Sequence, residues 1–372
     1  MGRISSFGQH LYEGRISFDF VGRRKTWYAI SLIILIVSGV AFGVRGFNMG
    51  IEFKGGVEFT AKVTQADSAA IDDLTNAVKD AGVPEAGDPI ASTSGSDAIR
   101  LQTKPLTQDQ AETIQKALTD AGAREVSQNL IGPSWGEQVA KKALTGLVVF
   151  VLIVIVFIWI YFREWRMSVA AIIALGHDLL ITAGVYAWSG FEVTPATVTG
   201  LLTILGYSLY DTVVVFDKVK ENTRHIPGSL SRTYAEEANL AVNQTLVRSI
   251  NTSITALLPV VALLIVGTAV LGTGPLKDLA LALFVGMAAG TYSSIFIATP
   301  LATQLKEREA TIRTHTKKVL TKRAKNESKA SSAPTQEPAQ TAPSRPVVVS
   351  GSAKRQQPSR KPRSQRGGGR PR

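Results

Sequence analysis

An aspartate stands inside an apolar stretch that is long enough to cross a membrane. The stretch covers residues 195–216, and Asp211 lies in its second half. A carboxyl group in hydrocarbon costs about 2.5–3.5 kcal/mol on insertion scales. Residues of this kind face the interior of a helix bundle and mark ion or proton pathways. The chemistry predicted for Asp211 is therefore the reversible binding of a proton.

Polar side chains recur at helical spacing in two further apolar stretches. The fourth stretch, which holds Asp211, carries on the same face Thr203, Tyr207 and Tyr210. The fifth carries on one face Arg248, Asn251, Thr252 and Thr255. His177 and Asp178 lie near the middle of the third, with Thr182 one turn further on. Lipid cannot satisfy these groups, so the polar faces must meet each other or water.

These residues suggest a proton relay. Desolvation inside a bundle favours the neutral form of Asp211, whereas contact with Arg248 favours the carboxylate. A helix motion that makes and breaks this pair would release and bind a proton, and Asp178 or His177 could pass it on. Tyr207, Tyr210, Asn251 and Thr252 would form the supporting polar face.

A structural role is the alternative for the same residues. Asp211 and Arg248 could simply neutralise each other and fix the register of two helices. His177 could only hydrogen-bond a neighbouring helix.

Six apolar stretches are each long enough to cross a bilayer. They cover residues 27–44, 139–162, 167–188, 195–216, 250–271 and 276–301. The chain of 372 residues is therefore predicted to be a polytopic α-helical membrane protein. A signal peptide is the alternative for the first stretch, because Arg23, Arg24 and Lys25 precede it. That stretch is longer than the usual apolar region of a signal peptide, which favours an uncleaved first helix.

Residues 45–138 form the long loop between the first two spans. Strand patterns at 57–63, 98–103 and 123–130 alternate with helical patterns at 67–81 and 107–121. Thr107 is the predicted N-cap of the second helix, with Gln110 three positions later. The order strand, helix, strand, helix, strand predicts a small α+β domain outside the membrane.

The short loops predict the orientation. Arg163, Arg166, Lys218 and Lys220 lie in two of them, whereas the loop at 189–194 has no Lys or Arg. The excess of positive charge on one side places both termini in the cytoplasm and the α+β domain outside the membrane. The segment 1–26 would be a cytoplasmic lead-in. The loop 217–249 would contain an amphipathic helix, 232–247, on the inner membrane surface.

The positive charge is concentrated in the C-terminal tail. Residues 306–372 hold 18 Lys and Arg against 4 Asp and Glu, while the whole chain has a net charge of +12. The segment 302–372 is predicted to be a basic, disordered cytoplasmic tail. Contact with anionic lipid headgroups is favoured for it over contact with RNA.

Several kinds of chemistry have no support in the sequence. The chain has no cysteine, so it has neither disulfides nor thiolate sites. It has no phosphate-binding loop, and its four histidines show no metal-binding spacing. We therefore expect no cofactor, no metal and no enzymatic activity such as ATP hydrolysis.

Three local patterns predict details of the helices. Gly286 and Gly290 form a Gly-xxx-Gly face typical of close helix packing. Pro259 should kink the fifth span. Ser134 and Glu137 match a capping box that would start the second span.

Residues 206–222 resemble a family signature. The sequence Gly-Tyr-Ser-Leu-Tyr-Asp-Thr-Val-Val-Val-Phe-Asp-Lys-Val-Lys-Glu-Asn is similar to Gly-Tyr-Ser-x-Asn-Asp-Thr-Val-Val-Val-Phe-Asp-Arg-x-Arg-Glu-Asn of the SecD/SecF protein-export membrane proteins, in the SecF branch. Residues 18–25, 50–56, 243–249 and the pair His177-Asp178 also agree, so the resemblance covers about 15–310. Two positions differ: Tyr210 stands where the family has Asn, and Glu52 where it has Asp.

The resemblance implies half of an RND-type transporter bundle that pairs with SecD beside the SecYEG channel. Such a pair would use proton flow to help preproteins cross after the SecA motor has worked. It also implies that Asp211 carries the proton and that Arg248 is functional. Two other functions remain open: an RND-like exporter of lipids or small molecules, and a structural subunit that moves no protons.

Overall fold

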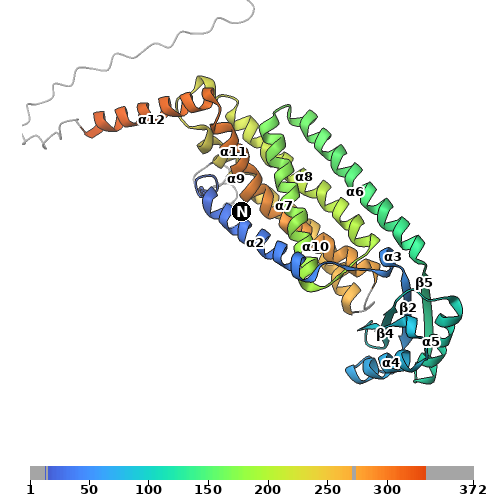
Figure 1. The fold of residues 1–372 in the computed structure, drawn as a ribbon. Coiled ribbons are helices and arrows are strands. Elements are labelled where there is room, and N and C mark those ends of the chain that lie inside the picture. Colours follow the sequence, from blue (N-terminus) through green and yellow to red (C-terminus); the bar gives the residue numbers. More distant parts are fainter. Residues whose placement is uncertain (1–12, 14–15, 270–273, 332–372) are drawn as a thin grey trace, which may run out of the picture. The chain divides into compact units, whose positions relative to one another are not determined.

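The computed structural model describes Glu13 and residues 16–269 and 274–331 of the chain. Within these ranges six helical segments are long and apolar enough to cross a membrane, as predicted (Figure 1). They are α2 (Arg24–Arg45), α6 (Pro133–Phe162), α7 (Trp165–Ser189), α8 (Pro195–Thr223), α9 (Tyr234–Ala269), and α10 (Pro275–Ser293) continued by a π-helical segment (Ser294–Ala298) and α11 (Thr299–Glu307). The chain is thus a multi-pass membrane protein.

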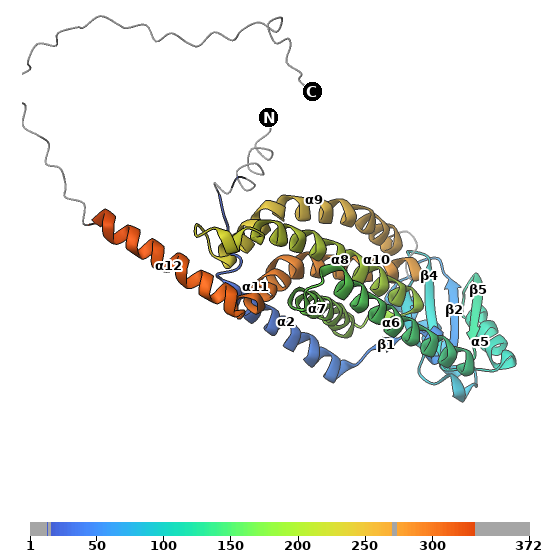
Figure 2. The same cartoon turned by 90° about the horizontal axis from the view of Figure 1, so that it is seen from above.

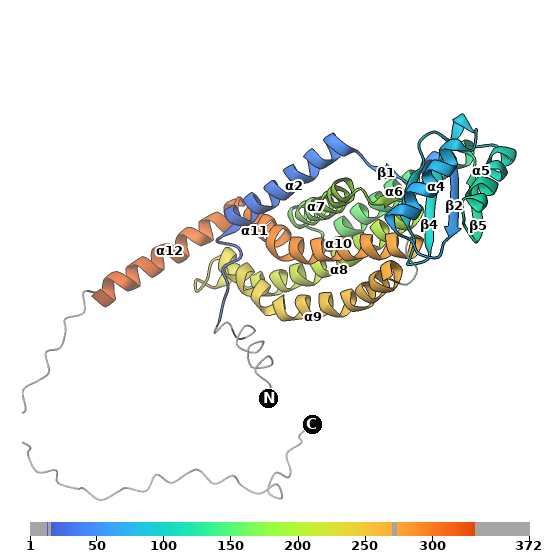
Figure 3. The same cartoon turned by 90° about the horizontal axis from the view of Figure 1, so that it is seen from below.

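Helices α7, α8 and α10 form the centre of the bundle. In α7 and in the span that begins with α10, about half of the most apolar 18-residue stretch is buried. In α2 and α6 the buried share of the corresponding stretch is 11%. Figures 2 and 3 show α2 and α9 on opposite sides of this central group. His177 and Asp178 of α7 and Asp211 of α8 are therefore surrounded by protein, whereas α2 and α6 have mostly lipid-facing surfaces.

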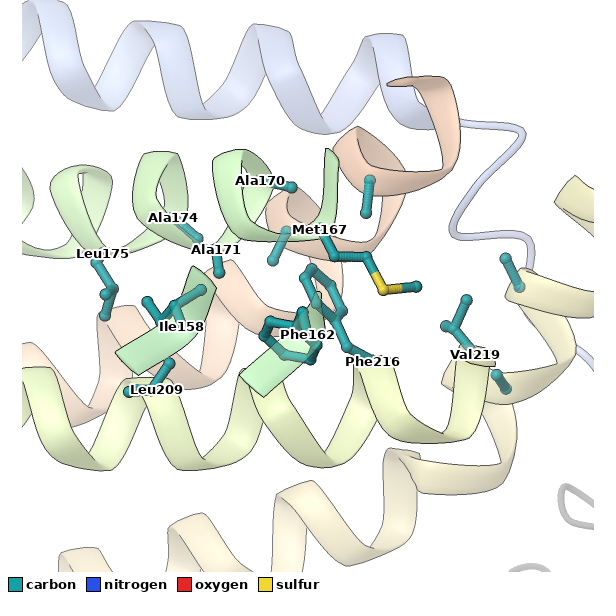
Figure 4. Close-up of a cluster of buried hydrophobic side chains, with 14 of the residues drawn as sticks. Ile158, Phe162, Met167, Ala170, Ala171, Ala174, Leu175, Leu209, Phe216 and Val219 are labelled. Carbon is teal, nitrogen blue, oxygen red and sulfur yellow. The ribbon is translucent and has the colours of Figure 1, made fainter. Parts of the chain in front are cut away.

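A hydrophobic cluster joins α6, α7 and α8 (Figure 4). Ala170, Ala171 and Ala174 of α7 are fully buried, and their small side chains let the neighbouring helices approach. Phe162 of α6 and Phe216 of α8 fill the space beside them, with ring centroids 5.3 Å apart. This cluster fixes α8 against α7 near the end opposite the sheet domain.

Two glycines set the distance between α10 and α8. A Cβ atom on Gly286 would lie 2.2 Å from Ile204, and one on Gly290 would lie 2.9 Å from Ser208. Real side chains do not tolerate such distances, so both positions require glycine. The predicted close packing at the Gly-xxx-Gly face is confirmed, and it occurs within the bundle.

The loop after α2 forms the expected α+β domain. Its sheet contains β2 (Gly56–Lys62), β3 (Ile90–Thr93), β4 (Ala98–Thr103) and β5 (Glu125–Ile131), all antiparallel in the order β3-β4-β2-β5. With α4 (Ser68–Asp80) and α5 (Gln108–Asp120) this is a split βαβ arrangement. Phe59 and Leu101 of the sheet are fully buried against Leu74 and Ile114 of the two helices. The predicted capping box of Thr107 and Gln110 is present, whereas β3 was not predicted.

Short elements connect the domain to the bundle. β1 (Asn48–Met49) pairs in parallel with β6 (Glu192–Val193), which precedes α8. α3 (Ile51–Lys54) follows β1 and ends at Gly55, whose φ is +75°. A Cβ atom on Gly55 would lie 2.8 Å from Cα of Pro133 at the start of α6. Below, the end of the bundle that bears the domain is called the outer end, and the opposite end the inner end.

The first turn of α6 differs from the prediction. The helix begins at Pro133, its N-cap is Gly132, and no side chain caps it. Ser134 and Glu137 therefore do not form the expected capping box. Pro133 starts the helix instead, because its fixed φ suits the first helical position.

The inner part of α9 also differs from the prediction. Residues 232–247 do not form a separate surface helix, because α9 runs as one helix of 36 residues with Pro259 inside it. Ala238, Ala241 and Val242, on its apolar side, are fully buried. Asn239 and Asn243 bind the backbone of Phe18, and Asn239 also that of Phe20. The amphipathic pattern thus reflects packing against the bundle and the N-terminal segment.

Part of the predicted disordered tail is helical. After α11 the chain forms α12 (Ala310–Ser331), and Ile312 and Val319 of this helix are buried. The chain divides into a body, Met1–Ala324, and a C-terminal unit, Lys325–Arg372, of which the structure describes only the last turns of α12. The predictions for residues 1–12, 270–273 and 332–372, including the Arg/Gly-rich end, lie outside the described residues.

Replacement of Gly286 by Leu should destabilise the bundle. The added side chain collides with Ile204, and overpacking of this kind costs about 1–3 kcal/mol. The free energy of unfolding in detergent micelles measures the effect. Gly146→Leu is the matched control, since a Cβ atom at Gly146 of α6 meets no heavy atom within 4 Å. Equal stability of the two variants would contradict the close packing of α8 on α10.

Candidate functional site

Asp211 of α8 is buried and is bound by two hydroxyl groups. Its side chain is 4% exposed. Ser249 Oγ of α9 donates to Oδ1 over 2.7 Å, and Ser294 Oγ, after α10, donates to Oδ2. No ion pair within 4.0 Å involves Asp211 among the described residues. Three helical segments therefore converge on this carboxyl group, and their contribution is hydrogen bonds without a cation.

Asp178 of α7 forms a second buried carboxyl site. It is 0% exposed and accepts from Ser208 Oγ of α8 at 2.5 Å and from Ser293 Oγ of α10 at 2.9 Å. His177 Nδ1 lies 3.3 Å from its other oxygen. Ser208 precedes Asp211 by one turn, so α8 contributes to both sites.

The two carboxyl sites share one segment of the chain. Ser293 contacts Asp178, and the next residue, Ser294, contacts Asp211. Ser294 begins the π-helical segment, and π-bulges occur frequently at functional sites. Through these neighbouring serines a shift of α10 would act on both carboxyl groups.

The hydroxyl groups suit both protonation states of each carboxyl. Ser293 Oγ also lies 3.2 Å from the Gly290 carbonyl oxygen, and Ser294 Oγ lies 3.1 Å from that of Thr291. A hydroxyl has one proton and can also accept. Each serine can therefore donate to a carboxylate, or donate to its carbonyl and accept from the protonated acid. The site needs no rearrangement of the backbone to bind or release a proton.

Arg248 lies away from Asp211 in this structure. It is exposed, and its Nη2 donates to the Tyr210 hydroxyl over 3.3 Å. Tyr210 is itself 52% exposed. The predicted pair of Asp211 and Arg248 is thus absent among the described contacts, and the Tyr210 hydroxyl binds the arginine. A cation on the exposed side of a membrane helix needs water or a partner protein beside it.

Of the other polar residues predicted on α8 and α9, one lies in the interior of the bundle and two lie toward its exposed side. Tyr207 donates to Ser253 Oγ of α9 at 3.1 Å, and Ser253 lies 2.7 Å from Thr291 Oγ1 of α10. Thr252 bonds only to its own helix, at the Arg248 carbonyl oxygen, and Asn251 is exposed. Tyr207 therefore belongs to the buried network, whereas Asn251 and Thr252 lie on the side of Arg248.

His177 is buried beside Asp178 and is only partly satisfied. It is 5% exposed, and its ring stacks on Tyr292 with centroids 6.0 Å apart. Its Nε2 has no hydrogen-bond partner among the described residues. A buried imidazole with one free nitrogen can accept or deliver a proton at Asp178.

The sequence did not reveal the four serines that bind the carboxyl groups. Ser208, Ser249, Ser293 and Ser294 are ordinary residues in transmembrane helices, where they commonly bond to their own backbone. Only Ser294 had a signal, since it follows Gly286 and Gly290 at the same spacing. Their role depends on which helices become neighbours, which periodicity does not reveal.

A cluster of charges joins the α+β domain to the bundle. Arg100 of β4 lies 2.5 Å from carboxylate oxygens of both Glu58 on β2 and Glu192 on β6. Gln102 donates to the same two oxygens at 3.2 and 3.3 Å. Because Glu192 lies just before α8, this cluster connects the domain directly to the helix that carries Asp211.

Glu52 adds an unpaired acid to this junction. Its Oε2 is buried and has no hydrogen-bond partner among the described residues. Burial, helped by the nearby Glu58 and Glu192, raises the pKa of Glu52 above its usual value. Burial of Glu52 in the folded protein therefore disfavours its charged form relative to the unfolded chain. Protonation of Glu52 thus stabilises the folded protein. This stabilisation is complete below the usual pKa of a glutamate and is lost as the pH rises through the raised pKa of the folded protein.

Among residues 16–269 and 274–331, no group of three or more His, Asp or Glu side chains is arranged to hold a metal ion. Asp178 and Asp211 do not share a site, and each is bound by hydroxyl groups.

Comparisons with known proteins agree with the motifs. Residues 110–308 match the family described as protein export membrane protein SecD/SecF, C-terminal, and residues 40–67 match the SecD/SecF GG motif. The GG motif includes Gly55 and Gly56 at the junction of the domain and the bundle.

Individual relatives cover most of this chain. The protein translocase subunit SecF of Streptomyces coelicolor is 49% identical over 90% of this chain and 88% of that protein. SecF of Mycobacterium tuberculosis is 43% identical over 86% of this chain and 74% of that protein.

A solved structure has a similar fold over most of this chain. The crystal structure of SecDF from Thermus thermophilus, a translocon-associated membrane protein, aligns with a TM-score of 0.69 and 31% identity. The alignment covers 79% of this chain and 39% of the SecDF chain, so this chain spans about two fifths of that protein.

Loss of the Ser249 hydroxyl should weaken the binding of α9 to α8. Ser249→Ala is expected to destabilise the protein by about 1 kcal/mol, the usual size of a hydrogen bond between membrane helices. Denaturant titration in mixed micelles measures it. The effect should disappear in an Asp211→Ala background, because the two residues form one interaction. Thr252→Val, which removes a hydroxyl bonded only within α9, is the control, and equal losses in both backgrounds would contradict the contact.

Arg100→Met should destabilise the junction of the domain and the bundle. It leaves Glu58 and Glu192 without their cation, and the expected cost is about 2–4 kcal/mol because the cluster is largely buried. The protease sensitivity of the segment between α2 and α6 and the free energy of unfolding of the protein measure this loss of stability. Lys62→Met removes an ion pair with Glu125 whose side chains are more than half exposed, so little or no loss of stability is expected. Similar losses in the two variants would rule out a special role for the cluster.

Proposed function

The chain belongs to the SecD/SecF family of protein-export membrane proteins, and from this we propose that it is a SecF-like subunit of the protein translocase driven by the proton-motive force. Its role is to assist late steps of preprotein translocation by transport rather than by catalysis. The observation that carries the proposal is the geometry of Asp211. This acid is buried within the membrane, has no cation beside it, and is bound by hydroxyl groups that suit both of its protonation states.

The cycle needs two arrangements of α8 and α9. In the arrangement described above, Asp211 is bound by Ser249 and Ser294, and Arg248 is turned to the exposed side. In the other, Arg248 reaches Asp211 and stabilises the carboxylate, so that the proton leaves. Asp178 and His177 stand one helix away and pass the proton along the bundle. Alternation between the two arrangements couples proton flow to movement of α8.

The outer domain would receive this movement through the Arg100 cluster. Glu192 is bound to Arg100 and lies three residues before Pro195, the first residue of α8. A shift of α8 therefore pulls on β4 and β2 of the domain. The domain would act on the exported chain at the outer side of the membrane.

The exposed polar side of α8 and α9 indicates a protein partner. Tyr210, Arg248 and Asn251 would be costly to expose to lipid. We assign this surface to a SecD-like protein, because the SecDF relative is a longer chain of which this one matches 39%. Association of the pair with a SecYEG channel, together with SecA and the preprotein, follows from the proposed role.

The proposed location is the bacterial plasma membrane with both termini in the cytoplasm. Arg163 lies between α6 and α7, and Arg166 lies in the first turn of α7, both at the inner end, as the positive-inside rule expects for a cytoplasmic end. The basic α12 follows the last span at the same end, where Arg24 of α2 pairs with Glu307 of α11 at 2.6 Å. Contact of the basic tail with anionic lipid is part of this proposal.

Replacement of Asp211 by Asn, or of Arg248 by Met, should abolish the proton-dependent part of export. We expect that component to fall roughly tenfold or more, equivalent to about 1.4 kcal/mol. Preprotein export from cells, with and without an uncoupler, measures it. Asp217→Asn is the control, because Asp217 is exposed near the inner end of α8 and bonds to Tyr161. Full uncoupler-sensitive export by both variants would leave only the structural role.

A further inference from the structure

An apolar cavity lies between the outer part of α6 and helices α7 and α8. Its volume is about 230 Å³. α6 contributes the residues of one face, Ala140, Ala143, Leu144 and Leu147. α7 contributes Thr182, Ala183 and Tyr186, and α8 contributes Thr197, Val198 and Leu201. Phe47, Met49, Phe53 and Val193 close its outer end. The cavity is separate from the Asp211 site, although Thr182 lies one turn from Asp178.

The hydroxyl groups in the wall are already bonded. Thr182 Oγ1 donates to the Asp178 carbonyl oxygen at 2.8 Å, and the Tyr186 hydroxyl donates to that of Asp278 at 2.9 Å. Thr197 Oγ1 takes part in the capping box of α8. A stable water molecule needs two to four polar partners, and an apolar cavity of about 150 Å³ is known to stay dry and bind a hydrocarbon. The wall therefore suits a hydrocarbon group better than water.

The cavity extends through about one third of the hydrocarbon core, within its outer half. From Ala140 to Phe162, α6 rises about 33 Å, which matches the thickness of the hydrocarbon core. The cavity begins at Ala140 and extends to Leu147, about 10 Å further along the helix. It thus runs from the level of the headgroups into the leaflet at the outer end. Because α6 is mostly exposed, lipid has access to its side.

Unpaired lysines lie at the headgroup level. Lys141 and Lys142 follow Ala140 on α6, and Lys54 follows Phe53 on α3. All three are exposed, and none forms an ion pair within 4.0 Å in the described part of the chain. Glu137 is the one acid in α6. Long lysine side chains extend along apolar surface toward phosphate groups.

We propose that this cavity binds one acyl chain of an anionic phospholipid from the outer leaflet, with the phosphate held by Lys54, Lys141 and Lys142. The apolar wall receives the hydrocarbon and the lysines receive the negative charge. A segment of exported polypeptide does not suit the cavity, since the wall offers no free partner for backbone N–H and C=O groups. The lipid would fill the gap between α6 and α7 and so support the helix that carries Asp178.

Photolabelling of the full chain in nanodiscs tests the proposal. The probe is a phosphatidylglycerol with a photoactivatable group on its acyl chain, and labelled peptides are identified by mass spectrometry. Wild-type protein should be labelled at cavity residues of α6, α7 and α8. Ala143→Trp, which fills the cavity, should reduce that labelling about tenfold. Ile153→Trp is the control, because Ile153 lies on the same helix, is 61% exposed and does not line the cavity.

The headgroup is tested separately. Combined replacement of Lys54, Lys141 and Lys142 by Gln should remove the preference for phosphatidylglycerol over phosphatidylcholine probes. Lys116→Gln, on α5 of the outer domain, should retain it. If Ala143→Trp is not monodisperse, Leu201→Trp fills the cavity from α8 instead. Unchanged labelling in the filled variants, no labelling of the cavity in wild type, or an unchanged lipid preference in the triple variant would overturn the proposal.

Discussion

The rest of the bundle depends on a carboxyl group that is buried in the membrane without a cation. Asp211 is held by Ser249 and Ser294, so α8, α9 and the segment after α10 must meet within hydrogen-bond distance. The glycines of α10 permit this, because they allow Ile204 and Ser208 of α8 to lie directly against the backbone of α10. Such an arrangement stabilises the acid only through hydroxyl donors, which can reverse their direction. It therefore provides a place where a proton can be bound without opening the bundle.

Three further contacts connect this interaction to the rest of the molecule. At the centre, consecutive serines bind Asp178 and Asp211, so α7 and α8 respond to the same segment of α10. At the outer end, Glu192 binds Arg100 immediately before α8 begins. At the inner end, Asn239 and Asn243 of α9 bind the segment that leads into α2. A change at Asp211 can thus reach the outer domain through α8 and the N-terminal segment through α9.

Much of the fold follows from the sequence, because apolar runs of about 20 residues and alternating strands are local patterns. The six spans, three of the four strands and both main helices of the α+β domain, the Thr107 cap and the packing role of Gly286 were predictable, whereas β3 was not. Burial of Asp211, Asp178 and His177 was also expected. The partners of the acids were not predictable, since they depend on which helix faces meet. For the same reason Arg248 was expected at Asp211 but is bound by Tyr210 here, and residues 232–247 were expected on the membrane surface although they continue α9.

Infrared difference spectroscopy of the reconstituted protein tests the central claim most directly. The carbonyl band of a protonated carboxyl group that vanishes in Asp211→Asn reports the state of this side chain alone. We predict that this band appears and disappears as the pH on the outer side is changed, and that the deprotonated state is lost in Arg248→Met. A band that stays constant at every pH at which the protein remains folded would contradict proton exchange at Asp211.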